Sequence, residues 1–352
     1  MDAKNILKLA AQKNASDVHL IFGQPPIFRV DGELFDANQI VGKGSFPVFG
    51  RDDLENFVAN LLDKELLKRF IDKRDLDFGC QVENFRFRVN FSFEKGNMKI
   101  VARVIRDEEQ TLEGLGLPPV VEKLLEARQG LILVTGPTGC GKSTTLAAMI
   151  NHINATKSVN IITLEDPMEY IFKPNMSIIS QRQLGSDMNS FASGLKHVLR
   201  QDPNVIMLGE MRDLETISTA LTIAETGHLV LATLHTYSAA QTIDRIIDIF
   251  PPFQQNQVKS QLSMVLSAVI SQRLLPKKGG GRIAAREILI NNSAVANLIR
   301  EGKIAQVKSV LETGAAAGMI TLDKSLRQLY KAGMITKEDA ISHMEDSRDL
   351  EE

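Results

Sequence analysis

The residues of this chain that are best placed to do chemistry begin with a glycine-rich run. Residues 136–143 read Gly-Pro-Thr-Gly-Cys-Gly-Lys-Ser. Glycine lets the backbone curl so that successive N–H groups point at the oxygens of a phosphate. The lysine would reach the β- and γ-phosphates, and the serine hydroxyl would ligate Mg²⁺. The pattern predicts a loop that binds ATP through Gly136, Pro137, Thr138, Gly139, Cys140, Gly141, Lys142, Ser143 and Thr144.

The segments that flank this loop have the character that a phosphate loop requires. The apolar run Leu131-Ile132-Leu133-Val134 predicts a buried strand before it, and residues 143–153 predict a helix after it. The amino end of that helix adds a partial positive charge beside the phosphates. We therefore favour binding of a nucleoside triphosphate over an ordinary glycine-rich turn.

Carboxylates follow two further predicted strands. Residues 205–209 form an apolar strand that ends in Glu210, which can hold Mg²⁺ or its water. The strand over residues 160–164 ends in Glu165 and Asp166, with Glu169 close behind. Because ligands of open α/β sheets bind at the carboxyl ends of the strands, we expect these groups near the phosphates. One of them could orient the attacking water, and spacing alone leaves open which.

Two histidines bracket the predicted strand 229–234. His228 and His235 are seven residues apart, so in an extended strand they point to opposite faces. A metal site shared by both is therefore not expected. We expect one of them to sense the phosphates, and the residues themselves do not decide which.

Arginines gather on one face of a predicted hairpin near residue 90. Alternation along residues 85–91 places Arg86 and Arg88 on the same face, and Lys99 and Arg103 lie on the next strand. Such a face can be ordinary solvated strand surface. It can also supply an arginine to a phosphate bound by the same or a neighbouring subunit.

The elements that must position these residues fall into two predicted domains. Residues 1–112 combine helices with antiparallel strands, which predicts a small α+β domain. Residues 120–352 alternate apolar strands with helices, which predicts a parallel sheet covered on both faces, and a helix is expected from Phe253 to about Leu274. Between them, residues 113–119 contain two glycines and two prolines, and we expect a hinge linker there.

The composition excludes several classes of protein. With 41 basic and 43 acidic residues the net charge is −2, so no basic field favours nucleic acid. Two cysteines are too few for a disulfide framework or a four-cysteine zinc site. No stretch approaches the roughly 20 apolar residues that span a bilayer, so we expect no direct membrane insertion. These features predict a cytoplasmic protein.

Several motifs together resemble those of the hexameric secretion and pilus motor ATPases. The phosphate loop is followed by Leu-Glu-Asp-Pro-Met-Glu-Tyr over residues 164–170 and by Gly-Glu-Met-Arg-Asp over residues 209–213. A histidine-containing motif runs from Thr226 to Thr236. Further matches are Ser16–Leu20, residues 86–90 (Arg-Phe-Arg-Val-Asn) and residues 271–274 (Ser-Gln-Arg-Leu).

The resemblance implies a fold, an assembly and a role for each matching residue. The fold would be a RecA-like phosphate-loop ATPase domain preceded by a small PAS-like α+β domain, assembled as a homohexamer. Arg88 and Arg103 would reach the nucleotide, and Glu165 would activate the attacking water. Glu210 would hold Mg²⁺ together with Ser143, and His228 would lie near the γ-phosphate. ATP and Mg²⁺ are the implied cofactors.

Within this family the chain is most similar to the retraction ATPases of type IV pili. Residues 294–301, Ala-Val-Ala-Asn-Leu-Ile-Arg-Glu, resemble a retraction motif but carry Ala296 where arginine is usual. The related pilus-extension and type II secretion ATPases usually have an additional N-terminal domain and four metal-binding cysteines, which we do not expect here. The alternative functions are a pilus-extension ATPase, a type II secretion ATPase, a RecA-like motor on nucleic acid and an inactive accessory subunit. The resemblance implies two partners, an inner-membrane pilus platform protein and a paralogous retraction ATPase. It also implies that the protein binds them at the cytoplasmic face of the inner membrane.

Overall fold

The computed structural model describes residues 3–30, 32–105, 110–346 and 350, and these divide into two compact units. The first comprises Met1–Glu108 together with Pro167–Ile171. The second comprises Glu109–Asp166 and Phe172–Glu352. The domain limits expected from the sequence, at residues 112 and 120, stay a prediction.

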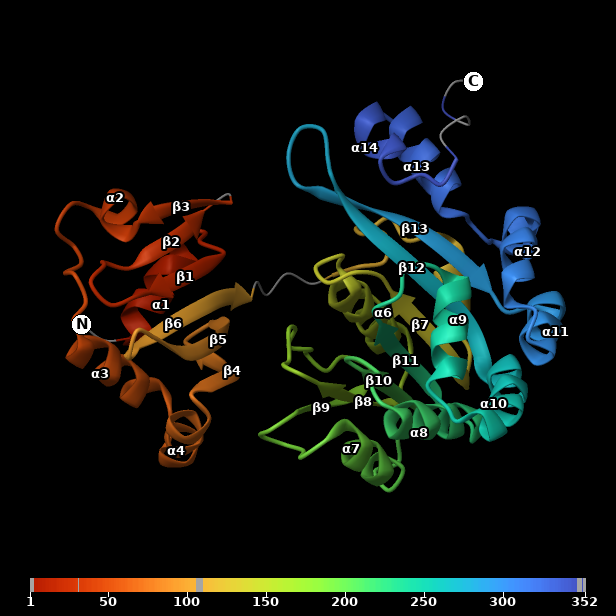
Figure 1. Cartoon of the computed structure of the whole chain (residues 1–352), viewed down its shortest axis with the longest axis horizontal. Helices are drawn as coiled ribbons and strands as arrows, with labels where there is room; N and C mark the ends of the chain where they lie inside the picture. The colour runs from red at the N-terminus through yellow and green to blue at the C-terminus, as the bar shows by residue number, and fades with distance from the viewer. Residues whose placement is uncertain (1–2, 31, 106–109, 347–349, 351–352) are drawn as a thin grey trace. The chain divides into compact units, whose positions relative to one another are not determined.

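The first unit is built on an antiparallel sheet of six strands in the order β3-β2-β1-β6-β5-β4 (Figure 1). Alternation along β5 buries Phe87, Val89 and Phe91 in its core. The helical segment over residues 51–73 is divided into two helices, because Asp63 caps the second by accepting hydrogen bonds from two backbone N–H groups. The elements are α1 (Ala3–Gln12), β1 (Asp17–Leu20), β2 (Ile27–Val30), β3 (Glu33–Asp36), α2 (Ala37–Val41), α3 (Arg51–Leu61), α4 (Lys64–Lys73), β4 (Asp75–Val82), β5 (Phe85–Glu94) and β6 (Asn97–Ile105).

The second unit contains a sheet of seven strands in the order β13-β12-β7-β11-β10-β8-β9. All neighbours pair in parallel except β12 and β13, which are antiparallel. The central strands are buried along their whole length, as expected for a sheet covered on both faces. Its first elements are α5 (Pro119–Leu125), β7 (Gly130–Thr135), α6 (Lys142–Thr156), β8 (Asn160–Glu165), β9 (Ile178–Gln183), α7 (Phe191–Val198), β10 (Val205–Leu208), α8 (Leu214–Glu225) and β11 (Leu229–Leu234).

The C-terminal part of this unit extends the sheet and adds helices to it. The last helices pack on the β12–β13 hairpin through Leu275, Ala285, Leu322 and Leu326 (Figure 1). No helix in the described part of the chain is both long and apolar enough to cross a membrane. The remaining elements are α9 (Ala239–Asp248), α10 (Pro252–Val265), β12 (Leu266–Pro276), β13 (Arg282–Ile290), α11 (Ser293–Glu301), α12 (Val307–Thr313), α13 (Leu322–Lys331) and α14 (Lys337–Ile341), with 3₁₀ turns at Ile304–Gln306 and Gly314–Ala317.

The structure corrects the prediction of one helix from Phe253 to about Leu274. Helix α10 ends at Val265, and the chain continues directly as strand β12. The apolar run at the junction fits a buried helix or a buried strand equally well, and the period of the sequence cannot separate the two. Pairing with β7 on one side and β13 on the other decides for the strand. This places residues 271–274 beside the end of β7.

The segment expected to act as a hinge lies within the second unit. Leu112 and Leu117 at its borders are buried. Arg286 on β13 donates hydrogen bonds to the carbonyls of Leu115, at 2.8 Å, and Gly116, at 3.3 Å. Burial lowers the pKa of Arg286 to about 10, so its guanidinium still carries its charge at neutral pH. For residues 113–119 to bend as a hinge, these hydrogen bonds must break.

Candidate active site

Several polar residues that the sequence analysis identified lie together at the carboxyl ends of the strands in the second unit's sheet. Strands β7, β11, β10 and β8 are adjacent and parallel, so their carboxyl ends lie at the same edge. The loop that begins at Gly136 follows β7, His235 follows β11, and Glu210 follows β10. Glu165 is the last residue of β8. The predicted convergence at this edge is therefore seen for Lys142, Glu210 and Glu165.

The glycines of the loop adopt backbone conformations that other residues would strain. Gly136 has φ of +143°, and a Cβ there would lie 2.3 Å from the carbonyl oxygen of Gln272 and 2.6 Å from Cys140 Sγ. Gly141, at φ of +89°, is the N-cap of α6. Helix α6 begins at Lys142 and runs for 15 residues, and its partial positive charge lies at the loop. Ser143 and Thr144 are in its first turn and are partly exposed.

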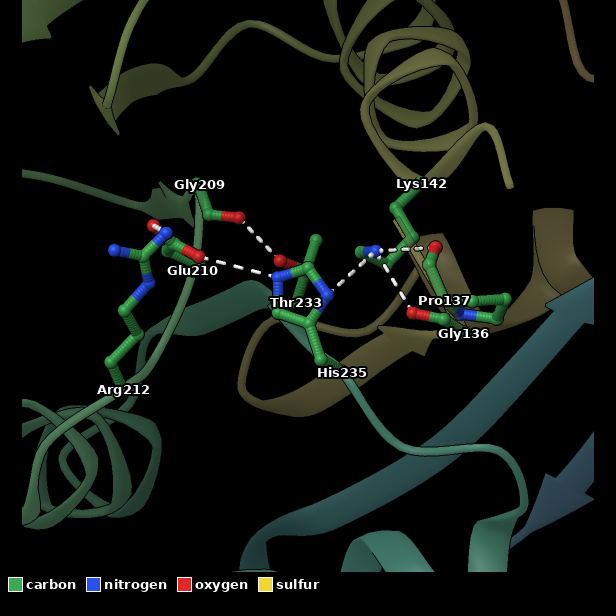
Figure 2. A network of polar contacts seen from close by, with 8 residues as sticks. All are labelled: Gly136, Pro137, Lys142, Gly209, Glu210, Arg212, Thr233 and His235. Carbon is green, nitrogen blue, oxygen red and sulfur yellow. Dashed lines mark hydrogen bonds and ion pairs between the residues drawn. The ribbon is translucent and has the colours of Figure 1, made fainter. Parts of the chain in front are cut away.

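A network of polar contacts joins the phosphate loop to the acid at the end of β10 (Figure 2). The ammonium of Lys142 donates to the carbonyls of Gly136, at 2.9 Å, and Pro137, at 3.0 Å. Its Nζ also lies 3.4 Å from Nδ1 of His235, whose Nε2 lies 3.4 Å from Oε2 of Glu210. Because an ammonium only donates and a carboxylate only accepts, Nδ1 accepts and Nε2 carries the proton. His235 thus links the loop lysine to Glu210.

Glu210 is held in place on both sides. Its other carboxylate oxygen lies 2.6 Å from Nη2 of the exposed Arg212, and its side chain is only 12% exposed. The backbone before it is fixed by Thr233, whose hydroxyl donates to the carbonyl of Gly209 (Figure 2). A partly buried carboxylate between two donors can exchange one of them for a hydrated cation, since oxygen ligands suit Mg²⁺.

Glu165 is a buried carboxylate with defined donors. Its side chain is 6% exposed, and Oε1 accepts from Thr163 Oγ1 at 2.6 Å and from Gln181 Nε2 at 3.0 Å. Gln181 belongs to β9, which the sequence did not predict as a strand. Only the parallel pairing of β8 with β9 brings it beside Glu165, so no local signal in the sequence could have found it.

The structure places His228, predicted to lie near the γ-phosphate, away from the phosphate loop of the same chain. His228 precedes β11, whereas the phosphate loop follows the parallel strand β7. His228 therefore lies at the amino ends of the strands, and the phosphate loop lies at their carboxyl ends. Six strand residues separate His228 from His235, which is roughly 20 Å along the strand. The His228 ring instead contacts the carbonyl of Ile223 and the hydroxyl of Thr226 at the end of α8. Within this chain His235, and not His228, lies beside the phosphate loop, and the catalytic role of either histidine stays a prediction.

The two predicted arginines lie in the first unit and differ in their surroundings. Arg88 and Arg103 face each other across the β5–β6 ladder. Arg103 Nε donates to Asp17 at 2.9 Å, and that carboxylate is nearly buried. Within the described residues, no hydrogen bond or ion pair holds the side chain of Arg88. Arg103 therefore has a structural partner, whereas Arg88 keeps its five donors available.

A cavity of about 310 Å³ adjoins the phosphate loop in the second unit. Its volume is at the lower end of the range for small-molecule sites. Cys140 is 3% exposed, and burial raises the pKa of its thiol, so little thiolate forms at neutral pH. The cavity is lined by Pro137, Thr138, Gly139, Cys140, Tyr237, Arg273, Leu274 and His343.

Comparison with known proteins identifies the family of this chain. The family model for type II/IV secretion system proteins matches residues 2–336. The chain is 44% identical to the type IV pilus retraction ATPase PilT of Pseudomonas aeruginosa over 341 residues, which are 97% of each chain. It is 38% identical to the type IV pilus ATPase PilU of the same bacterium over 352 residues, covering 99% of this chain and 90% of PilU.

A solved structure is similar to this chain over its whole length. The crystal structure of the pilus retraction motor PilT with bound ADP superposes with a TM-score of 0.92 at 45% identity, covering 100% of this chain and 99% of that one. The predicted fold class, an α/β ATPase domain preceded by a small α+β domain, is confirmed by this match. The chain therefore belongs to the ATPase family of type II/IV secretion system proteins, and the resemblance that its motifs predicted is confirmed.

Proposed function

We propose that this chain is the Mg²⁺-dependent ATPase motor that retracts a type IV pilus and thereby powers twitching motility. The observation that supports this most is the likeness to PilT along 97% of both chains. The network from Lys142 through His235 to Glu210 supports the ATPase part independently, because it joins a phosphate loop to an acid that can hold a metal.

The phosphates of ATP would bind at the loop between β7 and α6. Lys142 would leave the carbonyls of Gly136 and Pro137 and turn its ammonium to the β- and γ-phosphates, where the charge is larger. The loop N–H groups and the amino end of α6 would hold the remaining oxygens. The adjoining cavity has room for the nucleoside.

The residues present fit an Mg²⁺ ion, which usually binds one or two protein oxygens, several waters and the phosphates themselves. Ser143 would supply its hydroxyl and Glu210 its carboxylate, directly or through water. When bound, the ion neutralises charge that develops on the phosphate oxygens. Glu210 would exchange its contact with Arg212 for the hydrated cation.

Glu165 is our choice for the group that orients the attacking water. Thr163 and Gln181 fix one of its oxygens, so the carboxylate is held in a set orientation at the carboxyl edge of the sheet. General-base assistance needs this kind of positioned acceptor. Asp166 and Glu169 are the alternatives that the sequence left open.

His235, rather than His228, should matter for turnover. We expect His235→Ala to lower kcat about tenfold, because the link between Lys142 and Glu210 is lost while both groups remain. His228→Ala is the matched control from the other end of the same strand, and its kcat should stay within about twofold of wild type. Steady-state ATP hydrolysis measures both. A larger loss in His228→Ala than in His235→Ala would reject this assignment.

We further propose that the active form is a homohexamer in which an arginine of the N-terminal domain completes the site. Arg88 is the better candidate, since Arg103 is paired with Asp17. Nucleotide would bind one conformation of the subunit more tightly than another, and hydrolysis would shift the balance between the two conformations, so that the cycle can perform work. Movement at residues 113–119 would first have to break the Arg286 bonds.

This assembly predicts that the specific activity depends on protein concentration. ATP turnover per subunit should fall on dilution, because separated subunits lack the neighbour's groups. Arg88→Ala should lose about tenfold or more in turnover while still assembling, as judged by sedimentation. Arg51→Ala, another exposed arginine of the same unit, is the control and should behave as wild type. If the specific activity does not change on dilution or in Arg88→Ala, the proposed hexamer is contradicted, whereas the ATPase assignment still holds.

The retraction function itself is tested in cells. We expect a strain that lacks this chain to keep its surface pili and lose twitching, with recovery by the wild-type chain and not by Lys142→Ala. Loss of the pili themselves would favour the extension motor, and a secretion defect with normal pili would favour a type II secretion ATPase. We place the protein at the cytoplasmic face of the inner membrane, bound to the pilus platform protein, with a paralogue resembling PilU as a further partner.

A further inference from the structure

The motif over residues 271–274 lies beside the phosphate loop, and the site described so far does not use its glutamine. Strand β12 pairs in parallel with β7, and Ser271 is in register with Thr135, the residue before the loop. Gln272 is 2% exposed. Its backbone carbonyl lies so close to Gly136 that a Cβ at that position would be 2.3 Å away. Gln272 is therefore packed against the first residue of the loop.

The side-chain amide of Gln272 spans the loop and the helix that follows it. Its Nε2 donates to the carbonyl of Cys140 at 2.8 Å, and its Oε1 accepts from Thr145 Oγ1 at 2.9 Å. A carbonyl can only accept, so the NH₂ group must face Cys140. The hydroxyl of Thr145 then fixes the amide in that orientation. Both bonds are buried, where an unmet donor or acceptor is costly.

The bond to Cys140 also sets the direction of the next N–H group. A peptide unit is planar and trans, so the carbonyl of Cys140 and the N–H of Gly141 point in opposite directions. With the carbonyl held by Gln272, the Gly141 N–H points away from β12. Rotation of this peptide changes the φ of Gly141, which is positive and is a torsion that glycine varies at little cost, so the peptide turns easily without an anchor.

We propose that Gln272 is a positioning residue for the ATPase reaction, because it holds the Cys140–Gly141 peptide so that the Gly141 N–H faces the nucleotide phosphates. This rests on the proposed binding of ATP at the loop. It also gives the strand after α10 a role in the site: β12 supports the phosphate cradle from the side opposite the ligand.

The expected effect is on nucleotide affinity more than on the chemical step. A loop N–H that contacts the phosphates binds substrate, product and transition state about equally, and loss of such uniform binding raises KM with kcat retained. Gln272→Met keeps the shape of the side chain and removes both hydrogen bonds. We expect the Kd for Mg²⁺-ADP and the KM for ATP to rise about tenfold, with kcat within about threefold of wild type.

A second pair of variants tests the orientation of the amide without changing Gln272. Thr145→Val removes the hydroxyl that fixes the amide and should raise both constants about threefold, whereas Thr145→Ser keeps the donor and should restore them. Ser271→Ala is the matched control. It is a neighbouring buried residue on β12 whose hydrogen bond goes to the Thr135 hydroxyl and not to the loop, so nucleotide affinity should be unchanged.

The measurements are displacement of a fluorescent ADP analogue, steady-state ATP hydrolysis and thermal unfolding of each full-length variant. Weakened affinity in Gln272→Met and Thr145→Val, with Ser271→Ala and Thr145→Ser near wild type, supports the proposal. Unchanged affinity in Gln272→Met, or equal weakening in Ser271→Ala, overturns it. If Gln272→Met does not fold, the Thr145 pair decides in the same way. A wild-type chain that fails to bind ADP would instead reject the proposed function.

Discussion

Lys142→Ala should reduce ATP turnover by a factor on the order of 10³ or more. Loss of a single preorganised donor to a developing charge costs about 10²–10³ in rate, and this lysine also carries a full charge to the β- and γ-phosphates. The side chain is 8% exposed, so water cannot readily replace the ammonium. Mg²⁺-dependent hydrolysis at saturating ATP, together with the Kd for ADP, measures the loss.

Two further lysine variants make this result specific. Lys196→Ala removes an exposed lysine of the same unit whose ion pair with Glu215 lies at the surface, where such pairs contribute little. Its turnover should stay within about twofold. Lys142→Arg keeps the charge but not the compact ammonium that fits between two loop carbonyls, so it should also be strongly impaired. Full activity in Lys142→Ala would remove the site assignment altogether.

Glu165→Gln should lower kcat by about 10²–10⁴ while ATP still binds. This is the usual range for loss of a positioned general base. Glutamine has the shape of glutamate, and its oxygen can still accept the hydrogen bonds of Thr163 and Gln181, so the site should remain assembled. The separation of binding from turnover is the sign that the residue acts on the attacking water and not on the nucleotide.

The neighbouring carboxylates serve as controls for this prediction. Asp166→Asn and Glu169→Gln change the same charge within the same motif, and we expect each to keep kcat within about threefold. Single-turnover hydrolysis with preformed nucleotide complexes compares all three. If Asp166→Asn or Glu169→Gln lowers kcat as much as Glu165→Gln does, Glu165 is not the specific residue that orients the attacking water. The role would then belong to the other carboxylate, or the loss of a negative charge in this motif would explain the effect.

The sequence by itself determined the parts of the site that are local. The eight-residue loop, the strand before it and the helix after it are contiguous, so glycine spacing and apolar runs were enough to predict them. The same holds for the buried strands that end beside Glu165 and Glu210, because a continuous apolar run followed by a carboxylate is a local signal. The antiparallel hairpin that carries Arg88 and Arg103 was likewise visible in its alternation.

Only the tertiary structure decided which distant residues meet the loop. The choice of His235 over His228 depends on the direction of β11 relative to β7, which is a long-range pairing. The glutamines that hold Glu165 and the Cys140 peptide, Gln181 and Gln272, come from strands that the sequence did not predict. Segment 266–276 is a strand because β7 and β13 hydrogen-bond to it on both sides. Strand order and direction arise from contacts between residues far apart in the chain, and no local pattern encodes them.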